Sequence, residues 1–219
     1  VYSPYLSEAA SAAPTHMVQA MTARVHVQPR AGDHPVTILP AGTTLRVSRQ
    51  QADWCEVEMI GEHPRGWVME TSLRPLNALP LPENVACKQM IADARKLTGV
   101  YYLWGGNTAL GIDCSGLAQL VHRLAGYTLP RDADMQFDAG TPIEPPFSSG
   151  NLLFFASDVS PTRRKITHVG ISTGGWNIIH SSRLHNGVYE DDVQATPHPR
   201  DSFVGASLTV KPRYSWRVS

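Results

Sequence analysis

The chain has 219 residues, of which 42% are hydrophobic and 17% are charged, so it can bury the core of one large or two small globular domains. Its 19 Lys and Arg residues balance 19 Asp and Glu residues. The resulting net charge of zero argues against nucleic acid or an anionic membrane as a partner, because both attract a basic surface. No apolar run approaches the roughly 18–20 residues that cross a bilayer, so no membrane span is predicted.

The first third of the chain contains short strand-like runs. Residues 1–20 are rich in Ala, Ser and Pro without periodicity, and they are predicted to form a leader or an irregular arm. Residues 21–76 contain five short alternating runs separated by turn residues, a pattern typical of a small all-β barrel. The runs are RVHV, VTIL, TLRVSR, WCEVEM and GWVM. Their order resembles that of a bacterial SH3-like (SH3b) domain.

A proline-rich stretch marks the predicted domain boundary. Prolines at positions 75, 80 and 82 disfavour both helix and strand pairing. Residues 77–82 are therefore interpreted as an extended linker between the barrel and a second domain.

The second domain, residues 83–219, is predicted to begin with helices and to continue as a sheet. Apolar residues at helical spacing predict one helix over residues 83–99 and another that starts near Cys114 and ends at Gly126. The later runs NLLFFA, THVGIST, WNIIHSS and FVGASLTV predict successive strands of one sheet. Helices first and a sheet afterwards indicate an α+β fold.

One of the three cysteines differs from the others in its surroundings. Cys55 lies in a strand-like run and Cys87 in the first helix of the second domain, where each is expected to act as a small buried hydrophobe. Cys114 instead follows a Gly-rich segment and begins a predicted helix. Because the N–H groups at a helix start stabilise an anion, a thiol there ionises more readily and can act as a nucleophile.

Two histidines lie in strand-like runs, 12 positions apart. His168 and His180 are expected at corresponding points of neighbouring strands, where both could converge on Cys114. A histidine with its ordinary pKa of about 6.5 can take the proton of a thiol near neutral pH and return it to a leaving amine. The second histidine can fix the orientation and tautomer of the first.

The motifs around these residues resemble those of the NlpC/P60 cell-wall peptidases over nearly all of residues 83–210. The matching runs are YLWGG, DCSGL, LPRDADMQ, GNLLFF, THVGI and IHSS, in that order. The resemblance implies a papain-like domain in which Cys114 attacks the peptide carbonyl, His168 acts as base and acid, and His180 orients His168. It also implies that Tyr102 lies beside the thiolate and helps to stabilise the oxyanion. No metal or other cofactor is expected.

Within that family, the barrel together with YLWGG and LPRDADMQ is most similar to γ-D-glutamyl-L-diamino acid endopeptidases of the dipeptidyl-peptidase VI type. The similarity implies hydrolysis of the γ-D-glutamyl bond in peptidoglycan stem peptides or muropeptides with a free N-terminal L-Ala. It further implies that Asp113 and Ser115 hold the substrate beside the nucleophile. Arg131 and Asp132 would shape the D-Glu and amine pockets. Glu58, on the barrel, is the candidate partner of the free amine.

One position departs from the family pattern, because Gly150-Asn151 stands where Gly-Asp is usual. Asn keeps the hydrogen-bonding shape of Asp but not its charge, so the change concerns only a turn or local support role. Three further histidines, His122, His185 and His198, are assigned no function, and His122 is expected on the surface of its helix.

Three other functions remain open. An acyl-enzyme on Cys114 could pass to an amine or an alcohol, which would make the protein a transferase. Cys114, His168 and His180 could hold zinc, although no HExxH or CxxC spacing supports a zinc site. The chain could also be a non-catalytic wall-binding module. The intact DCSG and LPRDADMQ motifs favour hydrolysis.

The sequence does not distinguish diaminopimelate from lysine in the substrate, and it does not indicate an oligomeric state. A bacterial protein is expected, and both the cytoplasm, where wall peptides are recycled, and the cell envelope are compatible with the pattern.

Overall fold

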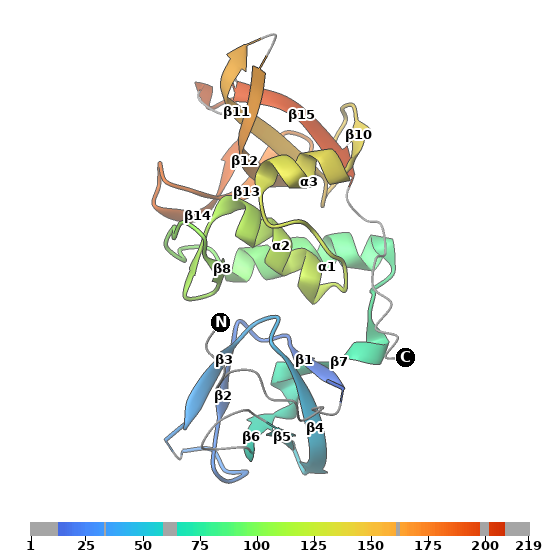
Figure 1. Cartoon of the computed structure of the whole chain (residues 1–219), viewed down its shortest axis with the longest axis vertical. Helices are drawn as coiled ribbons and strands as arrows, with labels where there is room; N and C mark the ends of the chain where they lie inside the picture. Colours follow the sequence, from blue (N-terminus) through green and yellow to red (C-terminus); the bar gives the residue numbers. More distant parts are fainter. Residues whose placement is uncertain (1–12, 33, 59–64, 161–162, 198–201, 209–219) are drawn as a thin grey trace, which may run out of the picture.

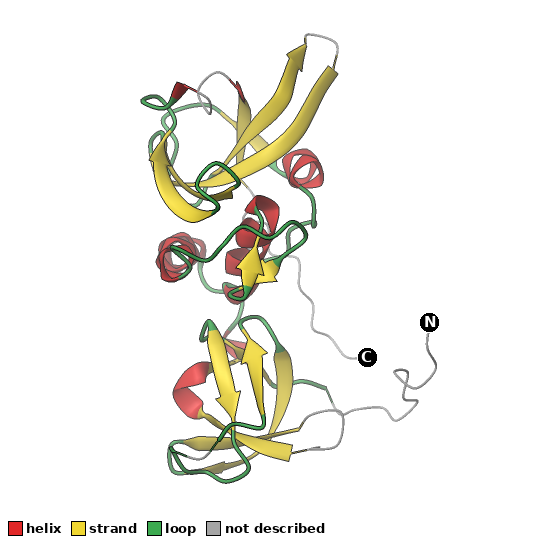
Figure 2. Ribbon diagram, turned by 90° about the vertical axis from the view of Figure 1, so that its left-hand side faces the viewer, coloured by secondary structure: helices red, strands yellow, loops and turns green. Residues whose placement is uncertain are grey.

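A computed structural model describes residues 13–32, 34–58, 65–160, 163–197 and 202–208. Figures 1 and 2 show a small barrel at one end of the molecule, a larger sheet at the other end, and helices between them. Within the described residues, none of the helices is long and apolar enough to span a membrane.

The barrel consists of seven strands in the described residues. They are β1 (His16–Val18), β2 (Thr22–Val25), β3 (Thr37–Pro40), β4 (Thr44–Gln51), β5 (Trp54–Glu58), β6 (Arg65–Met69) and β7 (Leu73–Pro75). Five of them form a sheet in the order β6-β5-β4-β1-β7, and β2 pairs with β3. A bridge between His26 and Trp67 joins the end of β2 to β6. All five predicted strands are present within two residues of their expected positions.

The first strand, β1, corrects the predicted irregular arm over residues 1–20. Residues 1–12 lie outside the described residues, but His16–Val18 pairs with β4 on one side and β7 on the other. Met17 and Val18 are buried. A strand of three residues is too short to show the alternation of apolar and polar residues that marks a strand, so the sequence pattern could not reveal it.

The proline-rich stretch is packed against the second helix. Leu76–Ala78 forms a short 3-10 turn. The Leu81 N–H donates to the Ala125 carbonyl over 3.0 Å, and the Leu81 carbonyl accepts from the Tyr127 hydroxyl over 2.6 Å. The stretch thereby satisfies a carbonyl at the end of a helix that has no partner within the helix itself.

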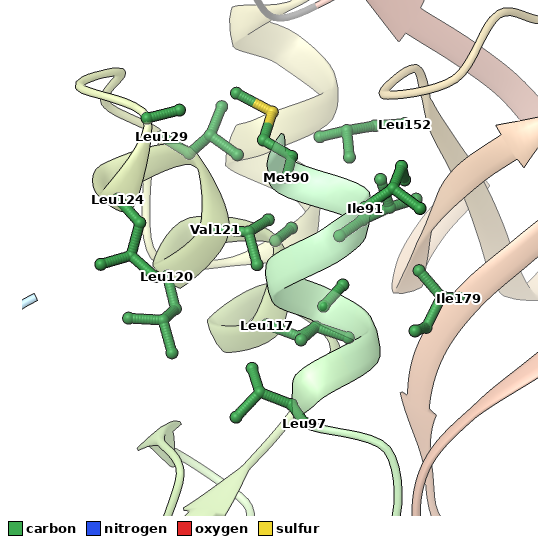
Figure 3. Close-up of a cluster of buried hydrophobic side chains, with 14 of the residues drawn as sticks. Met90, Ile91, Leu97, Leu117, Leu120, Val121, Leu124, Leu129, Leu152 and Ile179 are labelled. Atoms are coloured by element: carbon green, nitrogen blue, oxygen red, sulfur yellow. The ribbon is translucent and has the colours of Figure 1, made fainter. Parts of the chain in front are cut away.

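Three helices follow: α1 (Glu83–Lys96), α2 (Cys114–Leu124) and α3 (Ala133–Ala139). The first two were predicted, whereas no helix was predicted over the residues of α3. Figure 3 shows apolar side chains of α1 and α2 packed against each other and against strands of the larger sheet. The residues labelled there are Met90, Ile91, Leu97, Leu117, Leu120, Val121, Leu124, Leu129, Leu152 and Ile179.

His122 of α2 is fully buried, which corrects its expected surface position. None of the surface of this residue is exposed, so α2 is covered at His122 as well as along its apolar face. The His122 Nδ1 lies 2.7 Å from the Ala118 carbonyl, and burial lowers the pKa of His122 to about 4.

The larger sheet is antiparallel and has the order β10-β15-β11-β12-β13-β14. Its strands are β10 (Thr141–Ile143), β11 (Leu152–Ser160), β12 (Arg163–Gly174), β13 (Asn177–Ser182), β14 (Gly187–Asp192) and β15 (Phe203–Leu208). The four predicted strands are present, and β10 and β14 are additional. Successive residues of β11 contribute to cores on opposite faces: Leu152 and Phe154 to the helix side, Leu153 and Phe155 to the other. Burial on both faces explains the continuous apolar run.

Asn151 occupies a turn before β11. Its Oδ1 accepts from the Ser148 N–H over 2.7 Å, and the side chain is buried. This hydrogen bond needs only a side-chain oxygen as acceptor. Asn and Asp both have one, so either residue can form this turn.

The barrel and the helices share one hydrophobic core. Met17, Ala41 and Leu76 belong to the same buried cluster as Leu120 of α2. In addition, the Arg74 Nη1 donates to the Leu124 carbonyl over 2.7 Å, at the end of α2. The barrel is therefore docked against the C-terminal half of α2, while Cys114 lies at the opposite end of that helix.

Candidate active site

Cys114 is the first residue of α2 and is buried, with 7% of its surface exposed. A short ribbon of β8 (Asn107–Thr108) and β9 (Gly111–Ile112) leads into it. The loop before this ribbon packs directly on the start of the helix, since a Cβ added to Gly116 would collide with the Gly106 carbonyl. Only glycine at position 116 permits this close approach.

The Asp113 carboxylate organises the start of the helix. Its Oδ1 accepts from the Gly116 N–H over 2.7 Å, and its Oδ2 accepts from the Gly105 N–H over 2.8 Å. Arg131 donates to both oxygens, over 3.0 and 2.6 Å. The Ser115 hydroxyl donates to Oδ1 over 3.3 Å. These five donors occupy the two oxygens, so Asp113 supports the start of α2. It also lines the pocket beside Cys114, and its expected role in holding the substrate stays a prediction.

Ser115 and Arg131 belong to the same network. The Ser115 side chain is buried, and its hydroxyl also accepts from Arg131 over 2.9 Å. The Ser115 carbonyl accepts from the Gln136 amide over 3.0 Å. Gln136 is fully buried and holds the loop around Pro130 through a second bond of 2.9 Å. It ends the LPRDADMQ motif, but the sequence analysis gave it no role.

The structure brings His168 of β12 and His180 of β13 together. The His168 Nε2 lies 2.7 Å from the His180 Nδ1. If His168 is to accept the thiol proton, its own ring proton resides on Nε2 and is donated to His180. His180 then carries its proton on Nε2, which is 4.0 Å from an Asp191 oxygen. Asp191 was not predicted, because it lies in an edge strand without a recognisable motif.

His180 remains neutral in this arrangement. Only 4% of its surface is exposed, and burial lowers its pKa to about 2, with the charges of His168 and His185 acting in the same direction. A neutral His180 can accept a hydrogen bond on Nδ1 at all ordinary pH values. It is therefore suited to orient His168 without competing for its proton.

The surroundings of the Cys114 sulfur both oppose and assist ionisation. Burial raises the pKa of the thiol most strongly, and the Asp113 charge adds to that effect. Hydrogen bonds from the N–H groups of Val169, Ser115 and Cys114 itself lower it. The bond from Val169 places the sulfur against β12, next to His168. Burial outweighs the helix start, so deprotonation depends on transfer of the proton to His168.

Tyr102 lines the same pocket as Cys114. Burial raises the pKa of the Tyr102 hydroxyl, and the charge on Cys114 raises it further, while a hydrogen bond from Arg183 and its positive charge lower it. The hydroxyl therefore keeps its proton at neutral pH. A protonated hydroxyl near the sulfur is a suitable donor to an oxyanion.

Two pockets flank the cysteine and histidine and share Tyr102, Trp104 and Thr167. One, of about 560 Å³, is lined by residues that include Cys114, Ser115, Arg131, Asp132, Asp134 and Lys165. The other, of about 790 Å³, is lined by residues that include His168, His180, Arg183, Tyr189 and Asp191. Because they meet at shared residues, the pockets form one groove across the candidate active site.

Glu58 is not part of this groove. It is the last residue of β5, and its Oε2 lies 3.7 Å from the Arg46 guanidinium. It lines neither of the two pockets. The structure thus does not support Glu58 as the partner of a substrate amine. Asp132, which also begins α3, does line the pocket next to Cys114.

The geometry also bears on the zinc alternative. In the described residues there is no group of three or more His, Cys, Asp or Glu side chains arranged to hold a metal. The facing nitrogens of His168 and His180 are hydrogen-bonded to each other over 2.7 Å, so they do not both point toward one ion.

Replacing His180 by phenylalanine should lower kcat by about 10²-fold or more, because the His168 Nε2–H loses its acceptor and the wrong tautomer becomes accessible. Asn at this position offers a carbonyl oxygen and should restore part of the rate. The measurement is steady-state hydrolysis of a wall tripeptide, with His185→Gln as the matched control, since His185 is exposed and its ring lies against Tyr189 with 4.2 Å between the ring centres. Full activity of His180→Phe would contradict the orienting role.

Residues 99–206 match the family described as NlpC/P60. The γ-D-glutamyl-L-lysine dipeptidyl-peptidase of Bacillus subtilis (strain 168) is 34% identical over 117 residues, which are 52% of this chain and 38% of that protein. Its namesake in Bacillus cereus (strain ATCC 10987 / NRS 248) is 32% identical over 119 residues, or 54% of this chain and 34% of that protein. The chain thus spans about a third of the length of these curated relatives.

Solved structures show the same fold. An NlpC/P60 family protein from Bacillus cereus ATCC 10987 superimposes with a TM-score of 0.77 and 24% identity over 90% of this chain and 64% of that one. A protein of Staphylococcus aureus described as similar to an NLP/P60 lipoprotein gives a TM-score of 0.52 and 26% identity over 67% of this chain and 52% of that one. The first match extends over most of the chain, including strands of the N-terminal barrel.

Proposed function

Residues 99–206 are an NlpC/P60 domain, and from this premise we propose that the chain is a cysteine peptidase that hydrolyses peptidoglycan-derived peptides. The observation that carries the proposal is the alignment of three groups. The Cys114 sulfur lies next to β12 at His168, and His168 is hydrogen-bonded to the neutral His180 over 2.7 Å. Thiol catalysis requires a nucleophile, a base near it and a group that orients the base.

The reaction proceeds in two halves. His168 takes the Cys114 proton as the sulfur attacks the carbonyl carbon, and the resulting oxyanion accepts hydrogen bonds from Tyr102 and from N–H groups at the start of α2. His168 then gives the proton to the leaving amine, and the C–N bond breaks. In the second half His168 takes a proton from water, which attacks the thioester and releases the acid and the free thiol.

We further propose that the bond cleaved is the γ-D-glutamyl-L-diamino acid bond and that the N-terminal L-Ala must be free. The relatives named γ-D-glutamyl-L-lysine dipeptidyl-peptidases support this choice. The pocket beside Cys114 supports it as well, because it contains both charges that L-Ala-γ-D-Glu needs. Lys165 can attract the glutamyl carboxylate, and Asp132 or Asp134 can attract the ammonium, while Arg131 shapes the pocket from its pair with Asp113.

The test compares L-Ala-γ-D-Glu-L-Lys with its N-acetylated form. We expect release of L-Ala-γ-D-Glu from the free peptide with a kcat/KM at least roughly tenfold higher, since acetylation leaves the acidic pocket unpaired. Equal cleavage would remove the free-amine requirement and leave a general endopeptidase. Absence of cleavage of both peptides would contradict the hydrolase itself. Added amine that diverts the product to an amide would instead indicate acyl transfer.

A further inference from the structure

The larger pocket, of about 790 Å³, lies on the histidine side of the groove. Cys114 is among the residues that line the smaller pocket, whereas His168 and His180 line the larger one. In the proposed reaction His168 donates its proton to the leaving amine, so that amine must be within hydrogen-bonding reach of His168. The residue that is released therefore lies in the larger pocket, and the chemistry of its lining selects that residue.

Arg183 gives this pocket a cation. It follows β13 directly, and it is the one Lys or Arg among the described residues that line the pocket. Its guanidinium lies 5.4 Å from the centre of the Tyr102 ring and 5.1 Å from the centre of the Trp104 ring. Two aromatic faces fix the position of a side chain that would otherwise be mobile, which reduces the entropy lost when a ligand binds.

No carboxylate in the described part of the chain forms an ion pair with Arg183. In this it differs from Arg131, which is paired with Asp113, and from Arg95, which is paired with Glu190. A guanidinium has five N–H donors, so beyond its hydrogen bond to the Tyr102 hydroxyl Arg183 can still offer a pair of N–H groups to the two oxygens of a carboxylate.

The acidic residue of the same pocket does not oppose an anion at Arg183. Asp191 is largely buried, accepts from the Thr196 hydroxyl over 2.6 Å and lies 4.0 Å from the His180 ring. Its charge is thus directed toward the histidine pair, while Arg183 is exposed at the rim.

We propose that Arg183 binds a carboxylate of the amino acid that leaves, so that the preferred substrates carry a free carboxylate on the residue after the cleaved bond. This inference rests on the proposed function. Two carboxylates could supply the ligand: the main-chain carboxylate of a peptide that ends at the diamino acid, or the side-chain carboxylate of diaminopimelate. Both would form the same charged, two-point contact with the guanidinium.

The experiment uses four peptides. They are L-Ala-γ-D-Glu-L-Lys, L-Ala-γ-D-Glu-meso-diaminopimelate, and the two corresponding peptides with the main-chain carboxylate converted to a carboxamide. Loss of a hydrogen bond between charged groups is expected to lower kcat/KM by roughly tenfold or more. If the main-chain carboxylate is the ligand, both carboxamides are cleaved more slowly by that factor. If the side-chain carboxylate is the ligand, the diaminopimelate peptides are preferred over the lysine peptides, and main-chain amidation has little effect.

The variant Arg183→Gln decides whether Arg183 is responsible. The ratio of kcat/KM between preferred and disfavoured peptides should fall to about one, and Arg183→Lys should keep part of it because the charge remains. The ratio is the readout because Arg183→Gln also removes the contact with Tyr102, which can slow the cleavage of all four peptides by the same factor. Lys165→Gln is the matched control, because this cation lines the other pocket and should leave the ratio unchanged.

An unchanged ratio in Arg183→Gln, or equal rates for all four peptides with the unmodified protein, would overturn the inference while leaving the hydrolase intact. Failure to cleave any of the four peptides would count against the proposed function instead. Because Arg183 is exposed, its replacement should leave the melting temperature within a few degrees of the original value.

Discussion

Replacing Cys114 by serine is expected to abolish hydrolysis, with a fall in kcat of at least roughly 10³-fold. Burial already raises the pKa of the thiol, and its deprotonation depends on His168. A serine hydroxyl is a far weaker acid, so the same histidine cannot generate an adequate nucleophile. The substitution is nearly isosteric, and the fold should be preserved. Rates are measured with L-Ala-γ-D-Glu-L-Lys, and circular dichroism checks the fold.

A second cysteine supplies the control for this experiment. Cys87 lies on α1, where its sulfur packs near Gly150, and it lines neither pocket of the groove. Cys87→Ser should therefore keep most of the activity and the sensitivity to a thiol-alkylating reagent. Activity that survives in Cys114→Ser, or that is lost on addition of a chelator but not of the reagent, would show that the thiol is not the nucleophile.

Replacing Asp113 by alanine is expected to lower the free energy of unfolding by roughly 3 kcal/mol. The Asp113 side chain is 8% exposed and pairs with Arg131 over 2.6 Å, so its loss leaves a guanidinium that is partly buried and unpaired. Loss of the cap on the Gly116 N–H contributes about 1 kcal/mol of that effect. Urea denaturation followed by circular dichroism gives the measurement.

A double substitution separates the ion pair from the cap. Arg131→Leu in the Asp113→Ala background removes the unpaired charge, so the double variant should be less destabilised than the sum of the two single variants. Asp113→Asn keeps a cap oxygen and should lie between the alanine variant and the original protein. If Asp113→Ala unfolds at the same urea concentration as the original, the carboxylate does not organise the site.

The sequence patterns predicted much of the fold because its long elements are amphipathic or strongly apolar. The helix that starts at Cys114 and the strands around Phe154 and Ile179 have clear periods or apolar runs. Strands of three residues, such as β1 and β10, are too short to show a repeating pattern of apolar and polar residues, so they were not predicted. The burial of His122 was missed for a different reason: it depends on how α2 packs within the whole fold, which the local sequence does not show.

The candidate site was predicted unevenly. Cys114, His168 and His180 were predicted because each lies in a recognisable motif, and the structure brings the two histidines to 2.7 Å. What the sequence did not show are contacts between distant segments. Asp113 appears in its motif next to the nucleophile, but only the fold shows that Arg131 occupies its carboxylate. Arg183 has no motif of its own, and its position depends on aromatic rings about 80 residues earlier in the sequence.

The core that the barrel shares with α2 restricts how the barrel can act. To swing away, it would have to expose side chains such as Met17, Leu76 and Leu120, and each fully buried aliphatic side chain costs about 1.5–3 kcal/mol to transfer to water. Such a motion is too rare to accompany each turnover. The barrel therefore stays fixed at the end of α2 that lies away from Cys114, and none of its described residues lines either pocket of the groove.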